Sequence, residues 1–540
     1  MNIKKLISVS LTGILAGILS FPASAEEVAI DGIIYNILDD NSAQVSDYVP
    51  EAELGDVVIP DSIDYAGAKY EVVSIGYVAF AYCTSLTSIE LPESVTSIDL
   101  AAFAYCTSLT AIDLPESLTS IGDYAFRNCT SLTKIEIPEL VSTIGYMVFY
   151  YCRSLKMVDL PESLTSIGDF AFSFCSSLTE IDLPESLTSI GVEAFSHCSS
   201  LTEIDIPESV TSIGGHAFYN CSSLITINVA ENNPVYSSLD GVLYNKELTE
   251  LITCPGAKSS INIPVTVTSI GGDAFSFCSS LTEIELPETV TSIGRDAFSH
   301  CSSLTEMDIP ESVTSIGNYA FSYCSSLITI NVAENNPVYS SIDGVLYNKE
   351  LTELITCPGA KSSINIPATV TSIGDGAFLE CTSLTEIELP ESLISIGEVA
   401  FAHCTSLTEI ELPESVTSIG GLAFVICPLL NKVICKAVEV PEIVFNTFDG
   451  ISQDAILYVP AQALEDYENA DWDQYFSQIL PLEEAPDAGV SGIAADNDGY
   501  YRIYNLKGMA VKTTKDASEL NSLPAGLYII NGKKVMLLPN

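Results

Sequence analysis

The stretch that decides the fold runs from Cys175 to Val210 and reads CSSLTEIDLPESLTSIGVEAFSHCSSLTEIDIPESV. It contains nearly the same phrase twice, and its two cysteines are 23 residues apart. The same spacing links thirteen cysteines in three runs: Cys83, Cys106, Cys129, Cys152, Cys175, Cys198 and Cys221; Cys278, Cys301 and Cys324; and Cys381, Cys404 and Cys427. A fixed period in the twenties predicts a solenoid, in which no unit buries its apolar face alone and stacking makes one continuous core.

Each unit reads L-T-E-I-[ED]-[LI]-P-E-S-[VL]-T-S-I-G-x-x-A-F-x-x-C. From Leu178 to Leu183 apolar and acidic residues alternate, which predicts a strand with one buried face. Proline then ends the ladder, and residues 187–190 form a second extended piece before Gly191, where we expect a positive φ. The alanine, phenylalanine and cysteine of A-F-x-x-C share one side of a single helical turn.

Two nearly identical inserts interrupt the array, at residues 230–258 and 333–361. They lie 103 residues apart, so a block of several repeats has been duplicated whole. Asn233-Pro234 and Asp240-Gly241 are turn signals between short alternating runs. We therefore expect each insert to form a hairpin that leaves the solenoid unbroken.

The two ends of the chain differ from the repeats. Residues 1–25 combine two lysines, an apolar run and Ala23-Ser24-Ala25, which predicts a cleaved signal peptide and a secreted protein. No later apolar run reaches the length of about 18 residues that a membrane helix needs, so we expect no transmembrane segment. The expected domains are an N-terminal cap (26–72), the solenoid (73–429), a C-terminal cap (430–482), a linker (483–490) and a β module (491–540).

The last module differs from the rest in charge. It contains YYRIYNLKGMAVKT and LPAGLYIINGKKVMLL, which predict strands around turns at Lys507-Gly508 and Asn531-Gly532. Its six basic residues outnumber its four acidic ones, whereas the whole chain carries a formal charge of -51. The sign difference suggests that this module is recognised separately.

The repeat unit resembles the BspA-like class of leucine-rich repeats, found in surface proteins of host-associated bacteria. The inserts with N-N-P-x-Y-S-S-x-D-G-V-L-Y-N share the likeness, which covers roughly residues 30 to 482. The motifs IYNLKGMAVK and LPAGLYIINGKKV resemble the C-terminal sorting domain of type IX secretion. The resemblance implies a leucine-rich-repeat solenoid with hairpin inserts, attachment at the outer membrane of a Gram-negative bacterium, and adhesion to host matrix or bacterial surface proteins.

Two columns of carboxylates are the candidate binding site. They occupy two repeat positions, two residues apart, on one face of the predicted strands: Glu180, Asp182, Glu203, Asp205, Glu283, Glu285, Glu306, Asp308, Glu386, Glu388, Glu409 and Glu411. Stacked about 5 Å apart, adjacent carboxylates repel by about 1 kcal/mol even in water. The columns either form a solvated face that keeps the solenoid soluble, or receive cations, which would be a basic protein surface or a divalent metal.

The other reactive side chains suggest no catalytic site. The ladder cysteines share one position beside the buried phenylalanine, where they pack as core or, alternatively, pair between coils. His197, His300 and His403 precede ladder cysteines, at a corner that other repeats fill with aromatic residues; this row either covers the corner or docks sugars or proteins. Sixteen cysteines without a C-x-x-C pair and four histidines predict no zinc site, no cofactor and no catalytic triad.

We therefore expect a noncatalytic surface protein, not an enzyme, that binds protein partners through its repeats. The net charge excludes nucleic acid as a partner. A structural coat protein and a cation-binding solenoid without a protein ligand are the alternatives. The sequence alone assigns no place to Cys254, Cys357 and Cys435.

Overall fold

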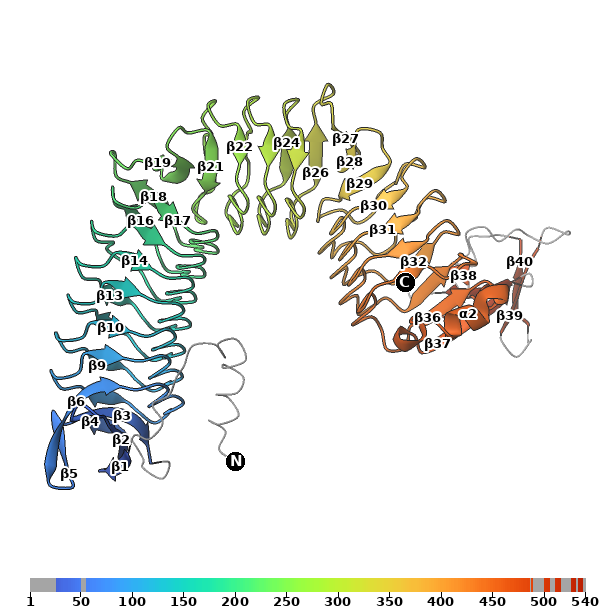
Figure 1. The fold of residues 1–540 in the computed structure, drawn as a ribbon. Coiled ribbons are helices and arrows are strands. Elements are labelled where there is room, and N and C mark those ends of the chain that lie inside the picture. The colour runs from blue at the N-terminus through green and yellow to red at the C-terminus, as the bar shows by residue number, and fades with distance from the viewer. Residues whose placement is uncertain are drawn as a thin grey trace. The chain divides into compact units, whose positions relative to one another are not determined.

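The computed structural model describes residues 26–49, 55–485, 487–488, 500–505, 510–515, 526–530 and 533–537. The chain comprises two units, Met1–Lys246 and Glu247–Asn540, each of which is a stack of coils (Figure 1). The predicted signal peptide and the turns at Lys507-Gly508 and Asn531-Gly532 lie outside the described residues. The strand-rich solenoid with 23-residue repeats, hairpin inserts and a small C-terminal sheet is confirmed.

One side of the coil carries a short bridge formed by the T-S-I segment. In the first unit Ser166–Ile167 pairs in parallel with Thr143–Ile144 before it and Ser189–Ile190 after it, at a register of one repeat. These strands are β8 Ser97–Ile98, β10 Ser120–Ile121, β12 Thr143–Ile144, β14 Ser166–Ile167, β15 Ser189–Ile190, β17 Ser212–Ile213, β22 Ser269–Ile270, β23 Ser292–Ile293, β25 Ser315–Ile316, β30 Ser372–Ile373, β31 Ser395–Ile396, β33 Ser418–Ile419 and β35 Glu442–Ile443.

The acidic segment of the repeat forms a second set of strands, which is discontinuous. These are β4 Asp56–Val58, β7 Ser88–Glu90, β9 Ala111–Asp113, β11 Lys134–Glu136, β13 Met157–Asp159, β16 Glu203–Ile206, β18 Thr226–Val229, β24 Glu306–Ile309, β26 Thr329–Val332, β32 Glu409–Leu412, β34 Lys432–Cys435, β36 Ile456–Val459 and β37 Gln478–Pro481. The strand predicted from Leu178 to Leu183 is wrong. This segment keeps the alternation of buried and exposed residues but forms no strand ladder with the coil before it or the coil after it.

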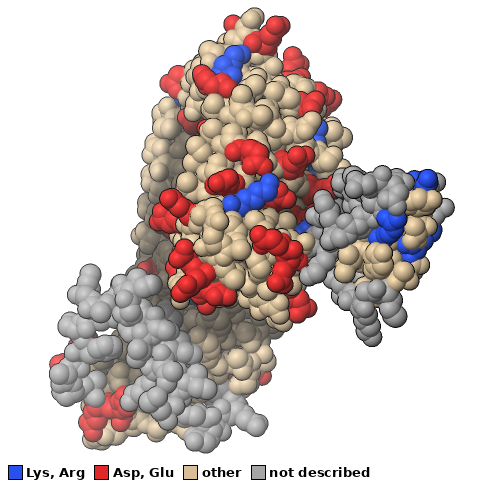
Figure 2. Space-filling view, turned by 90° about the vertical axis from the view of Figure 1, so that its right-hand side faces the viewer, with Lys and Arg blue, Asp and Glu red and all other residues tan. Residues whose placement is uncertain are grey.

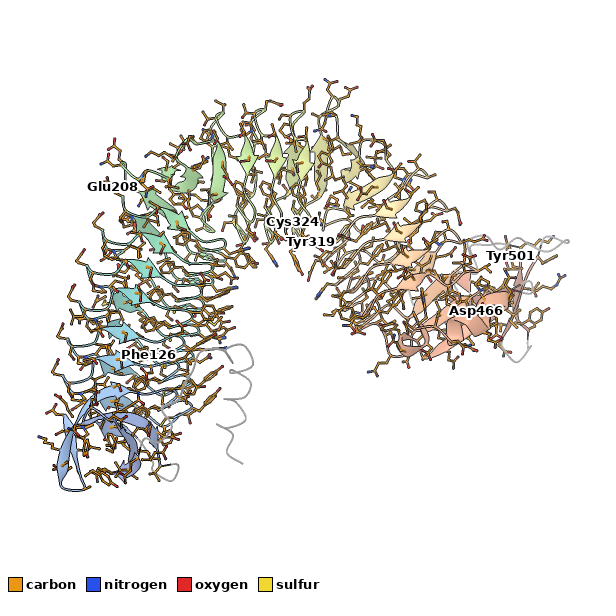
Figure 3. The ribbon with its side chains drawn as sticks, viewed as in Figure 1. Phe126, Glu208, Tyr319, Cys324, Asp466 and Tyr501 are labelled. Atoms are coloured by element: carbon orange, nitrogen blue, oxygen red, sulfur yellow. The ribbon has the colours of Figure 1, made fainter. Side chains whose placement is uncertain are left out.

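The core is a column of parallel phenylalanine rings. In the first unit the rings from Phe80 to Phe218 follow one another at centroid distances of 5.3–5.9 Å, tilted by at most 11°. Figure 3 shows Phe126 within this stack and Glu208 at the edge of its coil. Tyr48 continues the column at the N-terminal end, 6.4 Å from Phe80, and so covers an end that would otherwise expose core.

The glycine of S-I-G is needed for close approach and not for its φ. The expected positive φ at Gly191 is wrong; the left-handed residues of that turn are Glu193 and His197, at 51° and 60°. A Cβ on Gly191 would lie 2.5 Å from the backbone nitrogen of Asp169 and the carbonyl carbon of Gly168. Only glycine lets successive coils come this near.

Each insert forms the expected hairpin. In the first unit β19 (Tyr236–Leu239) pairs antiparallel with β20 (Val242–Asn245). The two residues between them, Asp240 and Gly241, have φ of 50° and 76°, as a type I′ turn requires. The remaining insert strands, all in the second unit, are β21 Glu250–Thr253, β27 Tyr339–Ile342, β28 Val345–Asn348 and β29 Glu353–Thr356.

The ends are built from other elements. The N-terminal cap contains β1 Glu26–Ile30, β2 Ile33–Ile37, β3 Ser42–Tyr48, β5 Ser62–Tyr65 and β6 Ala68–Ile75. The C-terminal cap contains η1 Ala461–Ala463, α2 Leu464–Glu468, η2 Asp473–Tyr475 and η3 Leu482–Glu484. Trp472 packs 5.3 Å from Phe448 and ends the ring column there. The last sheet contains β38 Asp487–Ala488, β39 Tyr501–Asn505, β40 Ala510–Thr514, β41 Gly526–Ile530 and β42 Lys533–Leu537.

Candidate functional site

The predicted carboxylates fall into three sets of four that recur every 103 residues. We name them patch A (Glu180, Asp182, Glu203, Asp205), patch B (Glu283, Glu285, Glu306, Asp308) and patch C (Glu386, Glu388, Glu409, Glu411). Each patch takes two residues from each of two successive coils. All of these side chains are exposed except Glu409, which is partly buried. Patch A lies in the first unit, and patches B and C lie in the second.

The two coils of each patch are not joined by a strand ladder. The segments that contribute the first two carboxylates, residues 178–183, 281–286 and 384–389, have no strand. In each patch, like charges face one another at both column positions, and each such pair costs about 1 kcal/mol at the dielectric of water. A single like pair does not decide whether a ladder forms, because β7 and β9 pair where Glu90 faces Asp113, whereas β9 and β11 form no ladder where Asp113 faces Glu136. The doubled repulsion adds to the cost of a ladder between the two coils of each patch.

Each patch has two rows of carboxylates, one on each of its coils. The coil that follows the patch donates hydrogen bonds to carboxylates of the second row. In the first unit β16 pairs with β18, and the Asn228 amide donates to Asp205 at 2.8 Å. In the second unit β24 pairs with β26, and the Asn331 amide donates to both Glu306 and Asp308, at 2.6 and 2.8 Å. An uncharged donor in the next coil therefore restores the ladder.

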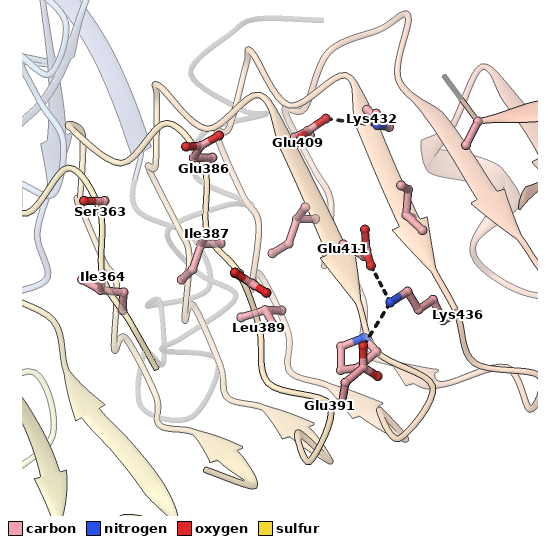
Figure 4. A pocket seen from close by; sticks show the side chains of 15 residues that line it. Ser363, Ile364, Glu386, Ile387, Leu389, Glu391, Glu409, Glu411, Lys432 and Lys436 are labelled. Atoms are coloured by element: carbon pink, nitrogen blue, oxygen red, sulfur yellow. Dashed lines mark hydrogen bonds and ion pairs between the residues drawn. The ribbon is translucent and has the colours of Figure 1, made fainter. Parts of the chain in front are cut away.

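Patch C is relieved by lysine instead of asparagine. Lys432 Nζ lies 3.2 Å from Glu409 Oε2, and Lys436 Nζ lies 3.0 Å from Glu391 Oε1 and also pairs with Glu411 (Figure 4). The carboxylates raise the pKa of Lys436, chiefly through the hydrogen bond that its ammonium group donates to Glu411. These side chains line a groove that also includes Glu386 and Glu388, the two carboxylates of patch C that pair with no lysine among the described residues.

Sequence reasoning missed Lys432, Lys436 and Glu391. The signal was present, because Lys432 stands 23 residues after Glu409 and so occupies the first acidic column. Residues 431–436 fall in the expected C-terminal cap, although a lysine in a column of carboxylates marks an internal counter-ion.

The ladder cysteines are hydrogen-bonded core residues. Cys198 Sγ donates to the carbonyl of Phe172 at 3.2 Å, and the same bond recurs one coil further with Cys221 and Phe195 at 3.1 Å. All sixteen cysteines are buried and none forms a disulfide. Burial raises the pKa of Cys152 and Cys221 to about 12, so these thiols are protonated and unreactive at neutral pH.

A family model described as the BspA type leucine rich repeat region matches residues 61–162, 142–259, 254–362 and 356–460. The chain belongs to this family. No curated protein matches the chain.

Several solved structures resemble this BspA type protein. A leucine rich cell surface protein from Faecalibacterium prausnitzii is 26% identical, with 85% of this chain and 95% of the other covered at a TM-score of 0.48. A leucine-rich repeat protein from Bacteroides ovatus is 28% identical, with 84% and 99% covered at a TM-score of 0.36. The pneumococcal vaccine antigen PcpA is 19% identical, with 86% and 100% covered at a TM-score of 0.40.

The corner row of this BspA type protein is a set of stacked rings. In the first unit Tyr151, Phe174 and His197 stack at centroid distances of 4.3 and 4.0 Å, each with a φ near 60°. Rings packed face to face offer mainly their edges to solvent, so the row fits corner packing better than docking of a flat sugar face. His197 accepts from the Asn220 amide at 2.9 Å in its neutral form, and burial lowers its pKa.

The acidic surface contains no metal centre in the part of the chain that the structure describes. No group of three or more histidine, cysteine, aspartate or glutamate side chains there is arranged to hold a metal ion. On the face drawn in Figure 2, acidic side chains far outnumber lysine and arginine. No helix among the described residues combines the length and apolar character needed to cross a membrane.

Proposed function

We propose that this protein is a noncatalytic binding protein of the cell surface that holds lysine- or arginine-bearing segments of host matrix or bacterial surface proteins on patches A and B. The observation that carries the proposal is the pairing in patch C. There the chain's own Lys432 and Lys436 neutralise Glu409 and Glu411. Patches A and B have carboxylates at the same repeat positions, with aspartate in place of glutamate at Asp182, Asp205 and Asp308.

Within the described residues, no lysine or arginine pairs with a carboxylate of patch A or patch B. Asparagine relieves only their second rows, through Asp205, Glu306 and Asp308. The first rows, Glu180 with Asp182 and Glu283 with Glu285, have no such donor among the described residues. A basic segment laid across a patch gains attraction to these carboxylates and removes the repulsion between the coils.

The repeat fold supports binding without catalysis, since solenoids of this family are typically not enzymes. Repetition also supports the proposal, because several weak sites on one chain give avidity to a partner with several basic segments. Attachment at the surface is assigned to the C-terminal module, whose basic residues differ in sign from the repeats. We include its role as a type IX sorting domain of a Gram-negative bacterium in the proposal.

The test measures binding of a decalysine peptide to the immobilised full chain by biolayer interferometry at 50 and 200 mM salt. In the patch A variant, Glu180→Gln, Asp182→Asn, Glu203→Gln and Asp205→Asn are combined, and affinity should fall several-fold at 50 mM salt. The matched control removes the same charge from the C-terminal cap by Glu465→Gln, Asp466→Asn, Glu468→Gln and Asp473→Asn. The control should bind within twofold of the native protein.

A second variant tests patch C in the opposite direction. Lys432→Gln with Lys436→Gln frees its carboxylates, so the peptide should bind more tightly. If the patch A variant and the cap control lose affinity equally, the peptide responds only to net charge and the assignment of binding to the patches is wrong. Binding unaffected by salt would exclude an electrostatic interaction of any kind.

A further inference from the structure

Cys254 and Cys357 lie near the end of the two inserts, where they take the place of the core phenylalanine. In a regular coil the phenylalanine N–H donates to the alanine carbonyl of the next coil, as Phe275 does to Ala297 at 2.7 Å. Cys254 makes that bond to Ala274, and Cys357 makes it to Ala377, each at 2.7 Å. Both thiols are about 95% buried. A small side chain therefore stands where the ring column is interrupted.

This replacement changes the partner of the next ladder cysteine. No phenylalanine carbonyl is available to Cys278, so its thiol donates to the carbonyls of Cys254 and Pro255, at 3.5 and 3.7 Å. Cys254 Sγ also lies 3.7 Å from the same Pro255 oxygen. Two thiols thus converge on one carbonyl, whereas Cys301 has the Phe275 carbonyl to itself at 3.1 Å.

The arrangement recurs 103 residues later. Cys381 Sγ lies 3.8 Å from the carbonyl oxygen of Cys357, and Cys357 Sγ lies 3.7 Å from that of Pro358. These contacts are longer than the 3.1–3.2 Å bonds of the phenylalanine-paired thiols, so less hydrogen bonding is lost if the sulfurs pair with each other. In both pairs the two thiols also hydrogen-bond to one another, which together with burial raises the pKa of Cys278 and Cys381.

We propose that Cys254–Cys278 and Cys357–Cys381 are two disulfide sites, closed by thiol–disulfide exchange with a small-molecule or protein disulfide oxidant. One cysteine thiolate attacks the oxidant disulfide, forming a mixed disulfide and releasing one thiol of the oxidant. The second cysteine thiolate then attacks the protein sulfur of the mixed disulfide and releases the other oxidant thiol. The protein loses two hydrogens per pair, and the oxidant gains them as two thiols.

We expect the thiol–disulfide exchange to take place while the chain folds. The thiolate is the attacking species, and in the folded state all four cysteines are buried, out of reach of an oxidant. The bond therefore closes before the coils stack, and it ties each insert to the coil that follows it. Reduced, folded protein should not react with the oxidant.

The test refolds the full-length native protein with oxidised and reduced glutathione, and then counts thiols after denaturation under non-reducing conditions. The count should fall from the sixteen cysteines of the chain to twelve. Non-reduced peptide mapping should link Cys254 to Cys278 and Cys357 to Cys381. The unfolding temperature should rise relative to protein refolded under full reduction.

Matched variants separate these pairs from the ladder. Cys254→Ser should remove only the first link, Cys357→Ser only the second, and Cys198→Ser neither. A full count of sixteen thiols after oxidative refolding overturns the proposal, and so do linked peptides that join neighbouring ladder cysteines. The native-protein map decides the matter even if a variant fails to fold.

Discussion

The thiol of Cys198 donates a hydrogen bond to the backbone carbonyl of Phe172, 26 residues earlier in the chain, at 3.2 Å. The bond joins the turn of one coil to the turn of the coil before it. It gives this carbonyl a second donor beside the N–H of Cys175, so the repeated cysteine fills the core and also links two successive coils.

The change Cys198→Val keeps the apolar volume at this position and removes the donor. The Phe172 carbonyl keeps the N–H of Cys175 as a donor at 3.1 Å, so the variant loses one of two hydrogen bonds, which is worth about 0.5–1.5 kcal/mol. We expect a lower free energy of unfolding in chemical denaturation followed by circular dichroism. Thr179→Val, at an exposed position, is the control and should change it by less than about 0.5 kcal/mol. Equal effects at both positions would show that the hydrogen bond contributes nothing.

Two glycines in successive coils distinguish close approach from chain flexibility. Gly191→Ala places a Cβ 2.5 Å from backbone atoms of the preceding coil, whereas a Cβ on Gly215 meets nothing within 4 Å. We expect Gly191→Ala to lower the unfolding temperature by several degrees and Gly215→Ala to leave it unchanged or raise it slightly. The measurement is thermal unfolding of both variants. Equal unfolding temperatures would contradict the packing argument.

Adjacent asparagines in the first insert have different roles. Asn233 is fully buried; its amide donates to the carbonyls of Pro207 and Val210, and its oxygen accepts from the N–H groups of Val235 and Tyr236. Asn233→Ala should cost about 2–4 kcal/mol and increase hydrogen exchange in the hairpin. Asn232→Ala, at the exposed neighbour, should leave exchange unchanged. Unaltered protection in the Asn233 variant would show that the hairpin is held by other contacts.

Acidification should weaken the corner row through its histidines. Burial lowers the pKa of His197 and His300, so the unfolded chain binds a proton at a higher pH than the folded chain does. Their contribution to stability is complete above the unfolded pKa of about 6.5 and is lost as pH falls toward the folded pKa. The unfolding temperature should drop between pH 7.5 and 5.5, and less so in a variant with both His197→Phe and His300→Phe. An identical drop in the variant would exclude the histidines as the cause.

The sequence predicts what depends on the period. Thirteen cysteines 23 residues apart required stacked coils, and Asp240-Gly241 required a hairpin turn. The ladder gap at residues 178–183 was not predictable from one repeat, because the alternation there is that of a strand. The ladder is also interrupted between β9 and β11, outside the patches, so the gaps depend on how neighbouring coils meet and not on the residue pattern of one repeat.

The role of single residues was harder to predict. Gly191 is expected to take a positive φ because it follows an extended segment, but the constraint on it comes from backbone atoms of Gly168 and Asp169 in the neighbouring coil. The same holds for Cys254, whose position in the phenylalanine column is defined by its hydrogen bonds with Ala274 and Cys278 of the next coil. The spacing of a repeat predicts the position of a residue within its own coil. It does not predict which atoms of the neighbouring coil that residue contacts.

The central claim is that a basic partner binds across the two unpaired coils of patch A and relieves their repulsion. The most direct measurement is hydrogen exchange of the amides in residues 178–183 and 203–206 of the full chain, with and without decalysine at 50 mM salt. We predict slower exchange there when the peptide is bound, and no such slowing in the variant with Glu180→Gln, Asp182→Asn, Glu203→Gln and Asp205→Asn. Unchanged exchange in these segments while the peptide is bound to the native protein would contradict the claim.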